Sequence, residues 1–179
     1  MVKVLVANRF TTGILIVVYL LLSSCTVGDE QSGVQIGDIA PPFVVEDING
    51  NKVSISDYKG KVLLLDFWAT WCPPCKDAIP HLNNLQQEFQ DTGFTVLGLS
   101  IDGKLEPVKK FYDIHSLKYP VLLADPITIR KYGVAQVPTI YLIGPDGRIV
   151  YKQLGMDKYQ EEYIKNKIES LLENKPKDV

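Results

Sequence analysis

Residues 61–90 constrain the fold of this chain more than any other stretch. Residues 62–68 form an apolar run that is interrupted only by Asp66. A continuous apolar run bounded by turn residues is typical of a strand that is buried on both faces. A Trp-Cys-Pro-Pro-Cys turn follows, and apolar residues then recur at helical spacing at Ile79, Leu82, Leu85 and Phe89. The stretch therefore predicts a strand, a tight turn and a helix in direct succession, as in an α/β fold.

Two cysteines, Cys72 and Cys75, lie in that turn. Pro73 and Pro74 favour the start of a helix, where a missing N–H group costs nothing. The sulfur of Cys72 should then lie near the free N–H groups of the first helical turn, which favour a thiolate. Cys72 is predicted to be the exposed nucleophile. Cys75, one turn further, is predicted to be the shielded thiol that attacks a mixed disulfide.

Two other uses of a paired cysteine motif are zinc binding and covalent haem attachment. A zinc site would need a second ligand pair, and the remaining candidates, Cys25, His81 and His115, have no paired spacing. Covalent haem attachment would need a histidine after the second cysteine, where Lys76 stands. The sequence thus predicts thiol–disulfide exchange with no metal and no other cofactor. Both histidines lie in helical patterns and are expected to face solvent.

The segment LLLDFWATWCPPCK, residues 63–76, resembles the active-site segment of the thioredoxin superfamily. Residues 34–172 resemble its TlpA/ResA branch, which comprises membrane-tethered thiol–disulfide oxidoreductases that act outside the cytoplasm. Pro80 matches the proline that kinks the first helix of thioredoxins, and Val137-Pro138-Thr139 matches the loop whose cis-proline faces the disulfide. The resemblance implies a thioredoxin fold: a central mixed β-sheet flanked by helices, with an N-terminal β-hairpin and a central insertion at residues 102–136.

The resemblance also implies which residues face the substrate. An ordinary trans bond before Pro138 and a plain surface role for Trp71 are the alternatives. One departure from the branch concerns carboxylates, since many relatives carry Asn in the strand and Glu three residues after the second cysteine. This chain has Asp66 and Ala78 there, an arrangement that resembles thioredoxin itself. The predicted substrate-facing residues are Trp71, Pro73, Pro74, Val137 and Pro138.

Asp66 is a carboxylate within a predicted buried strand, and desolvation raises the pKa of such a group. Strand alternation places it on the same side as Leu64 and Trp68. Two interpretations are open. Local backbone groups could hold the carboxylate, or it could store a proton for Cys75. We favour the second, because perturbed carboxylates are typical of functional sites.

The first 24 residues are typical of a targeting segment. They begin with Lys3 and Arg9, and residues 10–22 are largely apolar but shorter than the ~20 residues that span a bilayer. The segment ends in Leu-Ser-Ser before Cys25, which resembles a bacterial lipobox with Cys25 as the lipidated first residue. Cleavage nearby and an uncleaved signal anchor are the alternatives. All three export the domain.

The remaining chain is expected to form one domain. Residues 25–33 are predicted to be a tether, 34–173 the thioredoxin-like domain and 174–179 a polar tail. A hairpin is predicted around Asn49-Gly50, with later strands at 94–101, 121–123, 139–143 and 148–154. Helices are predicted at 106–115 and 126–132. A closing helix is capped by Asp157, and its apolar stripe comprises Tyr159, Tyr163, Ile164, Ile168, Leu171 and Leu172.

These features and the resemblance predict a membrane-tethered, extracytoplasmic thiol–disulfide oxidoreductase. It is expected to be a lipoprotein anchored to a bacterial membrane, in the periplasm or on the outer face of the cell, and a monomer. Its expected substrates are disulfides of exported proteins, for example in cytochrome c maturation, with electrons from a membrane-embedded thiol reductant. The net charge of −2 and the lack of a basic stripe give no sign of nucleic-acid binding.

Two other functions of the same fold are the alternatives. Peroxiredoxins place a threonine three residues before the peroxidatic cysteine, whereas Thr70 stands two before Cys72. A redox-inactive binding module is the other alternative. The intact cysteine pair together with Asp66 argues against it.

Overall fold

A seven-stranded mixed sheet organises residues 33–174, the part of the chain that the computed structural model describes. Its strand order is β2-β1-β5-β4-β3-β6-β7. The three central strands β5, β4 and β3 are parallel, and the outer strands pair antiparallel. The strands are β1 (Val44–Asp47), β2 (Lys52–Ser54), β3 (Val62–Trp68), β4 (Phe94–Ser100), β5 (Val121–Leu123), β6 (Thr139–Ile143) and β7 (Ile149–Leu154).

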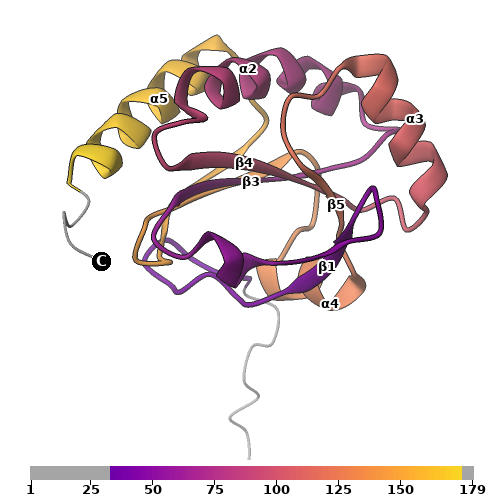
Figure 1. Cartoon of the computed structure of the whole chain (residues 1–179), viewed down its shortest axis with the longest axis horizontal. Coiled ribbons are helices and arrows are strands. Elements are labelled where there is room, and N and C mark those ends of the chain that lie inside the picture. Colours follow the sequence, from indigo (N-terminus) through magenta and orange to yellow (C-terminus); the bar gives the residue numbers. More distant parts are fainter. Residues whose placement is uncertain (1–32, 175–179) are drawn as a thin grey trace, which may run out of the picture. The chain divides into compact units, whose positions relative to one another are not determined.

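Helices cover both faces of this sheet, as Figure 1 shows. One face carries α2 (Pro73–Phe89), α3 (Leu105–His115) and α5 (Lys158–Glu173), and the other carries α4 (Pro126–Tyr132). A short 3₁₀ helix, η1 (Ile55–Tyr58), connects β2 to β3. No helix among residues 33–174 is both long and apolar enough to cross a membrane. The predicted signal peptide, Cys25 and most of the tether lie outside the described residues.

Strand β3 lies at the centre of the sheet and is buried along its whole length. Leu64 and Trp68 pack into the core beneath α2, α3 and α5, whereas Leu65 and Phe67 pack into the core on the α4 side. The prediction of a strand buried on both faces is thus confirmed. Because side chains alternate along a strand, Asp66 points toward the α2 side with Leu64 and Trp68.

The predicted elements are present, with end points shifted by one residue in β4, α3 and β7. The hairpin around Asn49-Gly50 joins β1 and β2. The predicted apolar stripe of α5 is only partly right. Ile164 and Ile168 are buried, but Tyr159 and Tyr163 are 72% and 48% exposed. Tyr163 packs beside the ring of Tyr151 on the edge strand β7, with ring centroids 5.1 Å apart.

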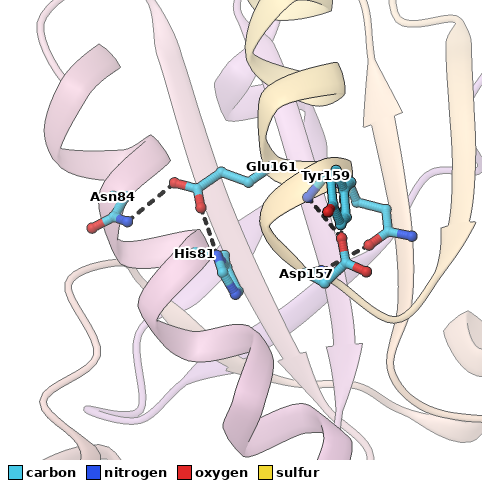
Figure 2. A network of polar contacts seen from close by, with 6 residues as sticks. His81, Asn84, Asp157, Tyr159 and Glu161 are labelled. Carbon is cyan, nitrogen blue, oxygen red and sulfur yellow. Dashed lines mark hydrogen bonds and ion pairs between the residues drawn. The ribbon is translucent and has the colours of Figure 1, made fainter.

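A polar network joins α5 to α2, the helix that carries the two cysteines (Figure 2). Glu161 of α5 pairs with His81 of α2 and accepts a hydrogen bond from Asn84 at 3.1 Å. The predicted cap Asp157 accepts a hydrogen bond from the N–H of Tyr159 at the start of α5.

The expectation that both histidines face solvent is wrong. His81 is half-buried against Glu161, and His115 stacks on Phe111 with ring centroids 4.1 Å apart. The partner of His81 comes from a helix about 80 residues later in the chain, so spacing within one helix could not reveal the pair.

Candidate active site

The site is built at the turn between β3 and α2. Cys72 is the N-cap residue of α2, with extended backbone angles, and Pro73 and Pro74 occupy the first helical positions. Cys72 forms a disulfide with Cys75, and its sulfur accepts a hydrogen bond from the N–H of Cys75 at 3.2 Å. The sulfur therefore lies at the first turn of α2, as predicted. In the reduced protein the same N–H group and the helix dipole would stabilise a thiolate on Cys72.

Cys72 is less exposed than predicted. Its exposed fraction is 4%, hardly more than the 2% of Cys75. The carbonyl oxygen of Val137 lies 3.6 Å from the Cys72 sulfur and covers part of it. Trp71 is 66% exposed, and Pro73 and Pro74 are also exposed, so these side chains make the protein surface around a recessed disulfide.

The Val137–Pro138 peptide bond is cis, as the resemblance implied. The loop lies against the disulfide through the Val137 carbonyl group. The Pro138 carbonyl oxygen accepts a hydrogen bond from the N–H of Gly155 at 3.1 Å, which ties the loop to the end of β7. The redox turn therefore contacts the cis-proline loop, and the loop in turn is bound to the end of β7.

Asp66 is buried, and burial raises its pKa from 3.8 to about 7. Its Oδ1 atom has no hydrogen-bond partner within the described part of the chain. The interpretation in which local backbone groups hold this carboxylate therefore finds no support at Oδ1. Burial and the charge of Asp66 together raise the pKa of Tyr119, which places a phenol in the same electrostatic environment.

The family model described as the AhpC/TSA family matches residues 36–152, more than half of the chain. The chain belongs to the AhpC/TSA family. The chain is 35% identical over 160 residues to the thiol-disulfide oxidoreductase ResA of Bacillus cereus. The alignment covers 83% of this chain and 92% of the relative. It is 34% identical over 145 residues to ResA of Bacillus subtilis, across 78% and 80%.

A solved structure gives the same result for the fold. The thioredoxin domain of a thiol-disulfide oxidoreductase from Bacteroides vulgatus aligns with a TM-score of 0.71 and 30% identity, across 76% of this chain and 99% of that domain. The predicted thioredoxin fold and the resemblance to ResA proteins are confirmed. This AhpC/TSA-family member is a thiol-disulfide oxidoreductase.

Sequence reasoning missed Gly98, which pairs with Asp66 across β3 and β4. A Cβ atom at Gly98 would lie 3.0 Å from the indole nitrogen of Trp68 and 3.0 Å from the ring of Tyr119. The glycine therefore lets both aromatic side chains lie close over β4, on the side of the sheet that holds Asp66. A glycine within an apolar strand is a recognisable signal of such a close approach.

Sequence reasoning also missed Asp102, which follows β4. Its carboxylate accepts a hydrogen bond from the hydroxyl group of Thr70 at 2.6 Å. This contact bears on the peroxiredoxin alternative, because the Thr70 hydroxyl donates to Asp102 and not to the sulfur of Cys72. No sequence signal distinguishes Asp102 from an ordinary turn residue.

Proposed function

We propose that this oxidoreductase reduces disulfides of exported proteins, including cysteine pairs of apocytochrome c, while a lipid on Cys25 tethers it outside the cytoplasm. The observation that carries the proposal is the Cys72–Cys75 couple at the N-terminus of α2, with the cis-proline loop against it. The names of the relatives support thiol–disulfide exchange as the reaction. The predicted signal peptide (1–24) and tether (25–33) support export of the 34–173 domain.

In the proposed reaction, the Cys72 thiolate attacks one sulfur of a substrate disulfide. The other substrate sulfur leaves as a thiolate and takes up a proton, which gives a mixed disulfide between Cys72 and the substrate. Cys75 then loses its proton and attacks the Cys72 sulfur. The second substrate thiol is released, and the Cys72–Cys75 disulfide forms. Two electrons have passed to the substrate, and a membrane-embedded thiol reductant restores the couple.

Asp66 is proposed as the group that takes the proton from Cys75. Cys75 is shielded from solvent, so a nearby base is needed. A carboxylate with a pKa of about 7 can exchange protons near neutral pH, where a carboxylate of ordinary pKa would stay ionised. Substrates are proposed to contact the exposed side chains of Trp71, Pro73 and Pro74. They are also proposed to contact the Val137-Pro138 loop, in which Val137 is half-buried and Pro138 is buried.

The direct test measures electron transfer to an unfolded polypeptide that carries one disulfide. The thiols that form when this disulfide is reduced are labelled and counted. The reduced wild-type domain should reduce the polypeptide stoichiometrically and end as the Cys72–Cys75 disulfide. The Cys72→Ser,Cys75→Ser double variant is the control and should release no thiols. Equal thiol release by the double variant would refute the proposal.

Lipid anchoring makes a separate prediction. Cys25→Ser is expected to abolish incorporation of labelled fatty acid and to release the mature domain from the membrane fraction, because the lipid is attached to that sulfur. Thiol–disulfide exchange by the purified domain should not change. A wild-type protein that incorporates no fatty acid would contradict the lipobox prediction and leave the redox assignment intact.

A further inference from the structure

Strands β3 and β4 are paired along their full length, up to Trp68 opposite Ser100. One more backbone hydrogen bond follows, from the N–H of Ile101 to the carbonyl oxygen of Trp68 at 2.9 Å. Beyond that point a side chain joins the two chain segments. We propose that Asp102 is a positioning residue whose carboxylate fastens the turn that carries Cys72 to the end of β4. We call the hydrogen bonds that the Asp102 carboxylate accepts from Thr70 and Ser100 the Asp102 latch. The inference rests on the Cys72–Cys75 couple proposed above.

The latch holds Thr70 at two points. The Thr70 N–H donates to Asp102 Oδ2 at 2.9 Å, and the Thr70 hydroxyl donates to Oδ1 at 2.6 Å. The last residue of β4 holds the Asp102 carboxylate in place, because the hydroxyl of buried Ser100 donates to Oδ2 at 2.7 Å. The N–H of Asp102 donates back to Ser100 Oγ at 3.2 Å. Hydrogen bonds to an ionised carboxylate are roughly twice as strong as neutral ones.

Thr70 is within the turn that presents the nucleophile. That turn runs from Ala69 to Cys72 and is closed by the N–H of Cys72, which donates to the carbonyl oxygen of Ala69 at 3.2 Å. Fixing Thr70 therefore fixes the path of the backbone into Cys72. In the oxidised protein the disulfide also holds Cys72 near Cys75. Once the disulfide is reduced or Cys72 is joined to a substrate, that covalent restraint is gone and the latch continues to act.

The latch thus has a larger effect on the reduced and mixed-disulfide states than on the oxidised state. It keeps the Cys72 sulfur where Cys75 can reach it, which raises the effective concentration of one sulfur at the other. Loss of the latch should disfavour closure of the Cys72–Cys75 disulfide and slow the attack of Cys75 on the mixed disulfide. The electron balance of the reaction is unchanged, since the latch acts only on geometry.

The test compares two variants of Thr70 with one of Asp102. Thr70→Val removes the hydroxyl donor, Thr70→Ser keeps it, and Asp102→Asn removes the charge and leaves one acceptor oxygen. We expect Asp102→Asn and Thr70→Val to lower the equilibrium constant for disulfide closure against glutathione by about three- to tenfold, where tenfold equals about 30 mV. Resolution of a mixed disulfide should slow by a similar factor. Thr70→Ser should stay within about twofold of wild type for both quantities.

Asp47 offers a matched control at the β1–β2 turn. Its carboxylate also accepts three hydrogen bonds, from the N–H of Asn49 and from the N–H and side-chain amide of Asn51. Asp47→Asn should lower stability without changing the equilibrium constant for disulfide closure. If Asp102→Asn does not fold, Ser100→Ala tests the latch from its other anchor and should shift the constant in the same direction.

Two results would overturn the inference: folded latch variants with wild-type equilibrium constants and resolution rates, or an equal shift in Asp47→Asn. A wild-type couple that does not equilibrate with glutathione would instead refute the proposed function, and the latch with it. A reversible wild-type couple with unshifted latch variants would refute the latch alone.

Discussion

Cells that carry Cys75→Ser are expected to accumulate covalent complexes between this protein and its substrates. In the proposed reaction Cys72 forms the mixed disulfide and Cys75 releases it, so a serine at position 75 stops the reaction after the first step. Turnover should fall to the background rate. The complexes should appear as high-mass bands in non-reducing gels, disappear on reduction and contain a substrate peptide linked to Cys72.

The two single cysteine variants serve as controls for each other. Cys72→Ser should capture nothing, because the N–H groups at the start of α2 stabilise a thiolate on the N-cap residue Cys72 and not on Cys75, which lies within the helix. Capture by Cys72→Ser and not by Cys75→Ser would reverse the assigned roles. This comparison is informative because Cys72 is 4% exposed, so exposure alone hardly distinguishes the two cysteines.

Replacing Asp66 with asparagine is expected to slow turnover near neutral pH by about tenfold or more. General-base catalysis typically contributes roughly 10²- to 10⁴-fold, and water that substitutes in part for the carboxylate lowers the minimum loss to about tenfold. The wild-type rate should rise as the pH increases through about 7, where the Asp66 carboxyl ionises. The variant should lack that rise. Asp47→Asn, which removes a carboxylate at a distant turn, should leave the profile unchanged. A wild-type rate for Asp66→Asn across the neutral range would make Asp66 a purely structural residue.

Asp66→Asn is also expected to change the pH dependence of the free energy of unfolding. The pKa of Asp66 is about 7 in the folded protein, whereas an ordinary Asp in an unfolded chain has a pKa of 3.8. The folded state therefore binds the proton more tightly than the unfolded state does. The resulting stabilisation is complete below about pH 4 and is lost as the pH rises to about 7.

Each pKa unit corresponds to about 1.4 kcal/mol, so ionised Asp66 costs the folded state on the order of 4 kcal/mol. The free energy of unfolding of Asp66→Asn, relative to wild type, should therefore increase between pH 4 and pH 8. Denaturant unfolding of the oxidised proteins measures this difference. A difference that is independent of pH would show that Asp66 keeps an ordinary pKa.

The redox turn could be predicted in detail because its determinants are local. The apolar run of β3, the proline pair and the cysteine spacing each act within a few residues, so the strand, the turn and the helix cap follow from the sequence. The burial of Asp66 follows from its position within that run. These predictions needed no knowledge of how distant segments pack.

The parts that were missed depend on contacts between distant segments. Asp102 meets Thr70 because parallel β3 and β4 end at the same edge of the sheet, and the pairing of His81 with Glu161 depends on the packing of α5 on α2. The Cys72 sulfur likewise contacts the carbonyl group of Val137, a residue 65 positions later in the chain. Hydrophobic periodicity describes which face of an element is buried, but it does not identify the polar partner that meets it.

The reduction potential of the Cys72–Cys75 couple tests the central claim most directly. It can be measured on the purified domain by equilibration with glutathione or dithiothreitol and quantification of the two redox forms. A reductant of exported proteins predicts a potential near that of thioredoxin, about −270 mV. A potential near that of the oxidant DsbA, about −120 mV, would contradict the proposed direction of electron flow.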